Sequence, residues 1–244
     1  MTWLDGKVID NQHWTDALFS LRVEAPELSF QAGQFVRIAL DIEGERVARP
    51  FSFVNSPDDR VLEFYGVIVP EGPLSPRLAK LRAGDSLHVA SNPAGFLVLS
   101  EVPDAQTLWL VSTGTGIAPF LSILRTETLW RRFREVVLVH AARHARELVY
   151  REMIAKLQGE KGLRYVTFVS REAAPGSLAG RIPAAVRDGR LEGAAGVRLS
   201  PETSHVLLCG NPQMLKDTTA ALAERGMRKH RRRTPGHITV ESFW

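Results

Sequence analysis

The stretch TLWLVSTGTGIAP, residues 107–119, joins an apolar, β-rich run to a turn that contains two glycines. Four further apolar, β-rich runs follow it, at residues 136–141, 165–170, 205–210 and 237–243. The intervals are long enough for crossover helices, and buried strands that alternate with helices are typical of a doubly wound parallel sheet. Residues 101–244 are therefore predicted to form an α/β domain.

The first hundred residues have a different pattern, in which turn residues separate short strands. Runs of strand character, bounded by glycine or proline, lie at residues 17–24, 34–41, 61–69 and 85–91. This pattern predicts an antiparallel β-barrel or sandwich over residues 1–100. The interruption GPLSPRLAKL, residues 72–81, has Ser75 placed to cap a short helix and Pro76 suited to its first turn. A linker is expected near residues 94–106.

The composition limits the chemistry that the chain can carry out by itself. Its 244 residues are 44% hydrophobic and 24% charged, which is typical of a folded, soluble protein. No apolar run approaches the roughly 18 residues of a membrane span, and the N-terminus lacks a signal-peptide pattern, so a cytoplasmic protein without membrane contact is expected. Cys209 is the single cysteine, and no group of potential ligands has metal-binding spacing. Redox chemistry would therefore require a bound organic cofactor.

Two glycines follow the first strand of the predicted parallel sheet, at the edge where such sheets bind ligands. Gly114 and Gly116 would let the backbone approach a pyrophosphate, whose charge the N–H groups of the next helix would stabilise. Pro119 stands where the usual dinucleotide fingerprint has a third glycine. The motif alone is equally compatible with an ordinary strand-to-helix turn, whereas its place in an α/β pattern favours a dinucleotide.

Arginines follow the next two strands. Arg143 comes after the second strand, Arg171 after the third, and Arg181 lies ten residues further on. An acidic residue usually holds a dinucleotide without a 2′-phosphate, whereas guanidinium groups suit the phosphate, so this pattern favours NADP over NAD. Each arginine alone is also compatible with an ordinary surface charge.

Two residues on the last two strands leave their roles open. Cys209 ends an apolar strand, where it is either a small buried residue or, given a nearby base, a nucleophile. Glu241 lies in the hydrophobic stretch VESFW and is either a solvated edge residue or a poised proton donor or charge stabiliser.

The stretch RPFSFVNSP, residues 49–57, places a cation beside aromatic rings. Alternate residues of a strand point to opposite faces, so Arg49, Phe51 and Phe53 would share one face while Ser52 points to the other. This arrangement suggests a flat anionic ligand.

Six motifs that occur in order along the chain carry a resemblance to a known family. They are RPFS (49–52), GPLSPRL (72–78), TGTGIAPF (113–120), SRE (170–172), CGNPQM (209–214) and the terminal VESFW. Together they resemble the bacterial ferredoxin (flavodoxin)–NADP reductases, and the likeness spans essentially the whole chain. The resemblance implies an N-terminal antiparallel barrel that binds FAD and a C-terminal α/β domain that binds NADP(H).

By this resemblance, most FAD ligands fall on the N-terminal domain. Arg49 would pair with the FAD pyrophosphate, Phe51 would pack against the isoalloxazine ring, and Ser52 would lie near its N5 atom. Phe51 stands where the family has tyrosine, a change that keeps the ring and loses a hydroxyl hydrogen bond. The short helix after Ser75 would turn its N–H groups toward phosphate. The implied FAD set is Arg49, Pro50, Phe51, Ser52, Phe53, Tyr65, Val67, Pro73, Leu74, Ser75, Thr115, Phe243 and Trp244.

The implied NADP(H) ligands lie at the strand ends of the C-terminal domain. They are Gly114, Thr115, Gly116, Ala142, Arg143, Ser170, Arg171, Arg181, Gly210, Asn211 and Pro212. The three arginines resemble the family's 2′-phosphate ligands, and Thr115 would approach both cofactors. Cys209 and Glu241 match residues beside the nicotinamide and, with Ser52, make up the implied catalytic set. Trp244 matches a terminal aromatic residue that stacks on the flavin or the adenine.

The implied reaction passes a hydride from NADPH to flavin N5, after which electrons leave singly to ferredoxin or flavodoxin. Such carriers are typically acidic and bind transiently, and the reductase is expected to be a monomer that binds no nucleic acid. The densest basic run, RKHRRR at residues 228–233, would steer the carrier, although it is equally compatible with a solvated charge run. Two alternatives are a flavin or ferric-chelate reductase of the same architecture, and a nucleic-acid-binding module that uses the basic run.

Overall fold

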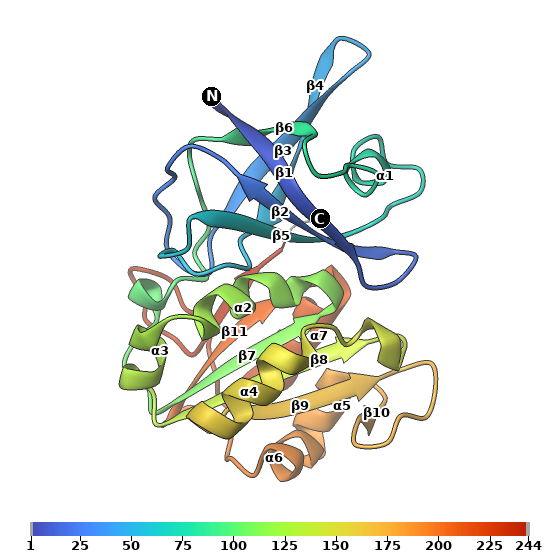
Figure 1. Cartoon of the computed structure of the whole chain (residues 1–244). Helices are drawn as coiled ribbons and strands as arrows, with labels where there is room; N and C mark the ends of the chain where they lie inside the picture. The colour runs from blue at the N-terminus through green and yellow to red at the C-terminus, as the bar shows by residue number, and fades with distance from the viewer. Residues whose placement is uncertain (1, 243–244) are drawn as a thin grey trace. The chain divides into compact units, whose positions relative to one another are not determined.

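A computed structural model of the chain describes residues 2–242 (Figure 1). The chain divides into two compact units. The first runs up to Val98 and takes in Ala118–Thr126, and the second comprises Leu99–Ile117 and the chain from Glu127 onward. Among the described residues, no helix combines the length and the apolar character that crossing a membrane requires.

The first unit is an antiparallel barrel. Its described residues form the strands β1 (Trp3–His13), β2 (Leu18–Glu24), β3 (Phe35–Ile42), β4 (Glu45–Ser52), β5 (Val61–Val67) and β6 (Ser86–Ala90). These pair in the order β4-β3-β6-β1-β2-β5, and an antiparallel bridge between Phe53 and Phe64 links the two ends of the sheet. The predicted antiparallel barrel is confirmed.

The core of the barrel is aromatic and aliphatic. Phe53 is fully buried and stacks on Phe30, with ring centroids 3.9 Å apart, and the tilted ring of Phe64 has its centroid 5.5 Å from that of Phe53. Helix α2 (Ala118–Leu124) belongs to this unit by its contacts, and the Ser122 hydroxyl donates a 2.7 Å hydrogen bond to the carbonyl of Asn55. The strand pattern alone does not predict this return of the chain.

The short helix α1 (Ser75–Leu78) differs from the expectation in its cap. Its N-cap residue is Leu74, which makes no side-chain cap bond, so the prediction that Ser75 caps the helix is wrong. The Ser75 hydroxyl instead accepts a 2.9 Å hydrogen bond from the N–H of Val69. The reason is local, because the hydroxyl satisfies a backbone donor of the preceding loop, where it closes residues 69–75 into a compact turn.

The second unit is a parallel sheet. Its described strands are β7 (Thr107–Thr113), β8 (Glu135–Ala142), β9 (Arg164–Val169), β10 (Leu178–Ala179), β11 (Ser204–Cys209) and β12 (Ile238–Glu241). They pair in the order β10-β9-β8-β7-β11-β12, and every pairing is parallel. The chain adds strands outward from β7 to β10 and then returns to place β11 on the other side of β7. The predicted doubly wound sheet is therefore confirmed, and the order in which strands are added reverses between β7 and β11.

Helices cover both faces of this sheet. The helices of the unit are α3 (Glu127–Arg132), α4 (Arg151–Lys161), α5 (Ile182–Arg187), α6 (Arg190–Ala195) and α7 (Pro212–Ala223), with 3₁₀ turns η1 (Leu99–Glu101), η2 (Gly114–Ile117) and η3 (Ala145–Glu147). Buried residues of α5, α6 and α7 form one core with Trp109, Val137 and Leu208 of the sheet. Helix α4 lies on the opposite face (Figure 1).

Candidate cofactor sites

The motif RPFS is carried by the β3–β4 hairpin of the first unit. Glu43 and Gly44 form its turn with positive φ values of 52° and 85°, which is the conformation of a tight two-residue hairpin loop. Beyond the turn, Arg49 is exposed, and its Nη1 donates to the carbonyl of Ala48 at 2.8 Å. Among the described residues its guanidinium makes no ion pair with an acid, so its charge is available to an anionic ligand.

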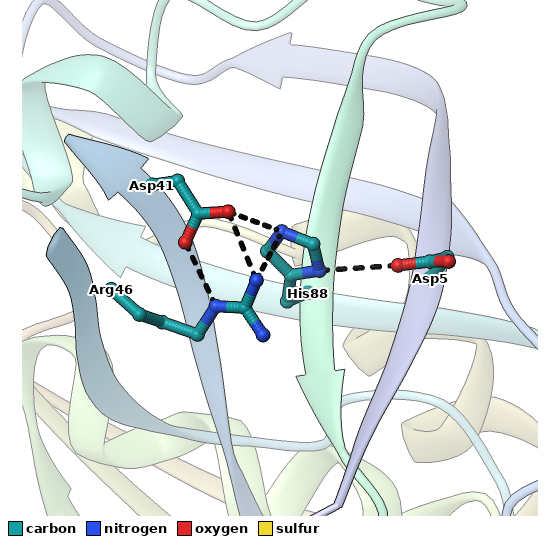
Figure 2. Close-up of polar contacts among 4 residues, drawn as sticks. All are labelled: Asp5, Asp41, Arg46 and His88. Carbon is teal, nitrogen blue, oxygen red and sulfur yellow. Dashed lines mark hydrogen bonds and ion pairs between the residues drawn. The ribbon is translucent and has the colours of Figure 1, made fainter. Parts of the chain in front are cut away.

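A polar cluster fastens this hairpin to the neighbouring strands (Figure 2). Arg46 donates two hydrogen bonds to the Asp41 carboxylate, at 2.8 and 2.9 Å. His88 of β6 lies between two acids, with Nε2 3.2 Å from Asp41 and Nδ1 3.2 Å from Asp5 of β1. The hydrogen bonds from Arg46 lower the pKa of Asp41 to about 2. Through Arg46 and His88, polar side chains therefore link the strand that carries the motif to β6 and β1.

The residues that follow Arg49 present one aromatic ring and one unsatisfied hydroxyl. Phe51 is half-buried, and Gly66 of β5 leaves room for its ring, because a Cβ there would lie 2.9 Å from Phe51 Cε1. Ser52 is buried, and its hydroxyl has no hydrogen-bond partner among the described residues. A buried hydroxyl without a partner is costly, so a polar ligand atom would satisfy it. These residues fit a flavin, whose ring offers both a flat face and polar edge atoms.

The other residues implied to bind FAD differ in how far they are buried. Phe53 lies wholly in the barrel core, and its backbone N–H donates to the Gln34 carbonyl at 3.2 Å, so its ring is not available to a ligand. Leu74 and Tyr65 are also buried, whereas Pro73 is exposed and Pro50, Val67 and Ser75 are half-buried. Phe243 and Trp244 lie outside the described residues.

In the second unit, the reversal point of the sheet brings two backbone turns together. The η2 turn after β7 packs on the end of β11 so closely that a Cβ at Gly116 would lie 2.6 Å from the Cys209 carbonyl oxygen. Gly210 adopts φ 135°, a conformation that favours glycine, and a Cβ there would strike Thr113. Because neither Gly116 nor Gly210 has room for a side chain, their backbone lies at the place where such sheets bind a pyrophosphate.

Helix α7 begins at this same edge. The N–H of Asn211 donates to the Thr113 hydroxyl at 2.9 Å, which joins the ends of β7 and β11. The side-chain oxygen of Asn211 accepts from the N–H groups of Gln213 and Met214, and Pro212 opens the helix. The predicted set Gly114, Thr115, Gly116, Gly210, Asn211 and Pro212 is thus brought together.

Three neighbouring strands each lead into an arginine at this edge. Arg143 follows β8, Arg171 follows β9 and Arg181 follows β10. Arg171 donates its backbone N–H to the Arg143 carbonyl at 3.0 Å, so these two positions lie side by side. All three side chains are exposed and, within the described part of the chain, form no ion pair. The two-residue strand β10, which the apolar pattern does not reveal, explains why Arg181 returns to the same edge.

Two carboxylates hold the loop after β8. Glu147 accepts hydrogen bonds from the backbone N–H groups of Arg143 and His144, at 2.9 and 3.3 Å. Glu172 accepts from the N–H of Ala145 at 2.7 Å and lies 3.2 Å from His144 Nδ1. The Ala145 N–H and the His144 side chain lower the pKa of Glu172, so it stays ionised at neutral pH. Sequence reasoning assigned no role to Glu172, although the motif SRE contained it.

Cys209 and Glu241 are neighbours across the β11–β12 pair. Cys209 is fully buried, and burial together with the charge of Glu241 raises the pKa of its thiol. The thiol therefore keeps its proton at neutral pH, which supports the small buried residue over the nucleophile. The basic run 228–233 lies at the opposite end of this pair, where Lys229 bridges to Ile238 at the start of β12.

Two family models match the chain in the same order as the two folds. The oxidoreductase FAD-binding domain matches residues 9–97, and the oxidoreductase NAD-binding domain matches residues 110–220. Flavodoxin/ferredoxin–NADP reductases of Shigella flexneri and of Escherichia coli strain K12 are each 56% identical over 245 residues, covering 99% of this chain and 99% of theirs. The chain belongs to the flavodoxin/ferredoxin–NADP reductase family. The predicted family and enzyme class are confirmed.

A solved reductase structure agrees with this assignment. The ferredoxin NADP⁺ reductase from Neisseria gonorrhoeae, solved with bound FAD and NADP, is 34% identical and covers 100% of both chains with a TM-score of 0.96. The match spans both the barrel and the parallel sheet. The RPFS motif at 49–52 falls within the FAD-binding match, and Gly114, Arg143 and Cys209 fall within the NAD-binding match.

Proposed function

We propose that this reductase moves electrons between NADPH and a ferredoxin or flavodoxin, with FAD bound near residues 1–100 and NADP(H) bound within residues 101–244. The observation that carries the proposal is that Arg143, Arg171 and Arg181, which form no ion pair with any described residue, lie at the same edge of the parallel sheet as the glycine-lined turn. Bound FAD accepts two electrons as a hydride and can release them singly, which suits a reaction between a nicotinamide and a one-electron carrier.

On the barrel, the residues of the motif RPFS would bind and orient the flavin. The exposed guanidinium of Arg49 would neutralise the FAD pyrophosphate. Phe51 would pack its ring on the isoalloxazine, and the Ser52 hydroxyl would gain the hydrogen-bond partner that the described protein atoms do not provide. Because Phe51 has no hydroxyl, it would orient the flavin by stacking alone.

On the parallel sheet, the binding groups would divide between two phosphates. The backbone of the turn at Gly114, Thr115 and Gly116 would hold the pyrophosphate, because N–H groups at a helix start attract negative charge. Arg143, Arg171 and Arg181 would hold the 2′-phosphate, which is the feature that distinguishes NADP from NAD. The proposal therefore predicts a strong preference for NADPH over NADH.

The finer features of the partner and the assembly also belong to this proposal. The carrier would be acidic and its contact transient, so exposed basic residues such as those of the run 228–233 would speed its approach. A monomer is supported by the scarcity of exposed large apolar side chains, which in the described chain are Ile9, Val69 and Phe96. A cytoplasmic location would keep the single thiol reduced. Sedimentation and cell fractionation test these two features.

The central experiment is an anaerobic titration of the purified yellow protein with NADPH and with NADH. NADPH should bleach the flavin absorption at stoichiometric amounts, and the bleached protein should then reduce ferredoxin or flavodoxin. A colourless protein that takes up no FAD, or equal responses to both nucleotides, would count against the proposal. Ferric citrate and free flavin serve as alternative acceptors, and a preference for either would favour a reductase of small molecules.

A variant and its matched control test whether Arg143 causes the preference for NADPH over NADH. Arg143→Ala should raise the KM for NADPH by about tenfold, the usual scale for a lost charge-assisted hydrogen bond, and leave the KM for NADH unchanged. Arg164→Ala is the matched control. Arg164 is also exposed, but it begins β9 at the other end of the sheet and pairs with Glu135, the first residue of β8. Equal effects of the two variants would contradict the assignment of Arg143.

A further inference from the structure

The buried histidine His140 lies beneath the turn that follows β7. It is the sixth residue of β8 (Glu135–Ala142), and its side chain has no exposed surface. Its Nε2 lies 3.1 Å from the carbonyl oxygen of Gly114, the first residue of η2. A carbonyl only accepts hydrogen bonds, so Nε2 must carry the proton and donate it.

The ring of His140 carries no charge under working conditions. Burial lowers the pKa of His140 to about 4, although the hydrogen bond to Gly114 raises it slightly. Its Nδ1 atom is buried and has no partner among the described residues. His140 therefore offers a fixed N–H dipole directed at one backbone atom.

The direction of the Gly114 carbonyl sets the direction of the next N–H group. The described chain contains no cis peptide bond, and in a planar trans peptide the C=O of one residue and the N–H of the next point in opposite directions. With the Gly114 carbonyl held toward His140, the N–H of Thr115 points away from it. Both Gly114 and Thr115 are half-buried, so this part of the turn is not closed off from a ligand.

The peptide between Gly114 and Thr115 needs such an anchor. Gly114 has φ 53° and no atom within 4 Å of the position of a Cβ, so packing around that position does not hold the residue in place. Glycine populates several backbone conformations at similar cost. A hydrogen bond to a buried, rigid ring removes that freedom before any ligand arrives.

We propose that His140 is a positioning residue for the dinucleotide, which aims the Thr115 N–H at the pyrophosphate by holding the Gly114 carbonyl. This inference rests on the proposed NADP(H) site and names a residue beneath it that touches no ligand. The affinity for the dinucleotide is then higher, because the turn already has its binding conformation before the ligand arrives.

A second buried histidine in the same sheet provides the matched control. His205 is the second residue of β11, at the other end of the sheet; it is 1% exposed, and its Nε2 lies 2.9 Å from the Thr239 hydroxyl. Burial lowers the pKa of His205 to about 3, so it is also neutral. A loss that came only from disturbing the core would appear equally in His205→Leu and His140→Leu.

The experiment measures ligand binding by oxidised, FAD-loaded protein in a calorimeter, with NADP⁺ and adenosine 2′-phosphate as probes. Adenosine 2′-phosphate offers the 2′-phosphate and lacks a pyrophosphate. We expect His140→Leu to weaken NADP⁺ about fivefold, the scale of one hydrogen bond, and to leave adenosine 2′-phosphate within about twofold. His140→Gln, whose amide N–H can reach the same carbonyl, should restore NADP⁺ binding, and His205→Leu should change neither affinity.

Three outcomes would overturn the inference: unchanged NADP⁺ affinity in His140→Leu, equal loss for both probes, or equal loss in His205→Leu. If His140→Leu yields no FAD-loaded protein, His140→Met supplies a flexible side chain without a donor, and the same comparisons apply. Failure of wild-type protein to bind NADP⁺ would instead refute the proposed function. The two failures are therefore distinguishable.

Discussion

The packing around Gly116 predicts what a single methyl group would do to the nucleotide turn. An ideal Cβ at Gly116 would lie 2.6 Å from the carbonyl oxygen of Cys209 and 2.8 Å from the Cα of Gly210. Both are backbone atoms, so no side chain can rotate away to relieve the clash. Gly114, in the same turn, has open space at its Cβ position, so only its φ of 53° disfavours a side chain there. Gly116→Ala should therefore disturb the turn more than Gly114→Ala.

The contact distances give the size of the disturbance. Tight contact ends near 3.4 Å, so the turn or the end of β11 must move from 2.6 Å by about 0.8 Å. A misplacement of about 1 Å near a reacting centre can slow a reaction by about 100-fold. Gly114→Ala instead incurs the cost of a left-handed alanine, about 1–2 kcal/mol, without displacing its neighbours. We expect flavin reduction by NADPH to slow about 10- to 100-fold in Gly116→Ala and less than about fivefold in Gly114→Ala.

The assay is stopped-flow reduction of each FAD-loaded variant by NADPH without oxygen, followed by the loss of flavin absorption. Both variants should hold as much FAD as wild type, and dithionite, which needs no nucleotide site, should reduce all three proteins at the same rate. The steric reasoning is refuted if the two variants are slowed equally, or if Gly114→Ala is slower than Gly116→Ala.

Three other perturbations have definite expected outcomes. Phe51→Tyr should retain FAD but shift its absorption or its reduction rate; identical spectra and kinetics would mean that the missing hydroxyl has no effect. The pKa of Asp41, about 2 against an ordinary 3.8, makes the bond to Arg46 a stabilising contact above pH 4 that is lost as the pH falls toward 2. Asp41→Asn should therefore lower the urea midpoint at pH 7 and not at pH 2, and a deficit that is independent of pH would contradict this. Glutamine at the basic positions of 228–233 should slow ferredoxin reduction at low salt and not at high salt, whereas Lys156→Gln, an exposed α4 control, should have no such effect.

The fold could be predicted because its signals are periodic and local. The strands β7, β8 and β11 are apolar runs buried on both faces, and β9 has Val166, Phe168 and Val169 buried, so hydrophobicity alone marks these strands within a residue or two. The strand β1 was not predicted, because its sequence WLDGKVIDNQH buries only Gly6 and Val8 and shows little alternation. It nonetheless pairs with β2 and β6 in the middle of the barrel sheet. Backbone pairing, and not side-chain burial, places it there.

The candidate site could be predicted only in part, because the local sequence around a residue does not show which residues of other strands it contacts. Arg143 and Arg171 follow strong strands and could be expected at one edge. His140 is an ordinary member of the run VVLVHA, and its importance depends on a carbonyl 26 positions earlier in the chain. For Ser75 the sequence predicts a role that the structure does not show. Serine is a favourable capping residue, but the Ser75 hydroxyl accepts from the N–H of Val69 and does not cap α1.

Burial decides between the two roles that the sequence left open for Cys209. Its thiol is enclosed at the end of β11 and lies opposite Glu241 in the strand register. Low polarity disfavours a thiolate, and the charge of Glu241 disfavours it further, so both effects raise the pKa in the same direction. Hydride transfer requires no thiolate, because the cofactors carry both electrons. In the proposed nucleotide site Cys209 can therefore act through its size, and Glu241 is the member of the pair that can act through charge.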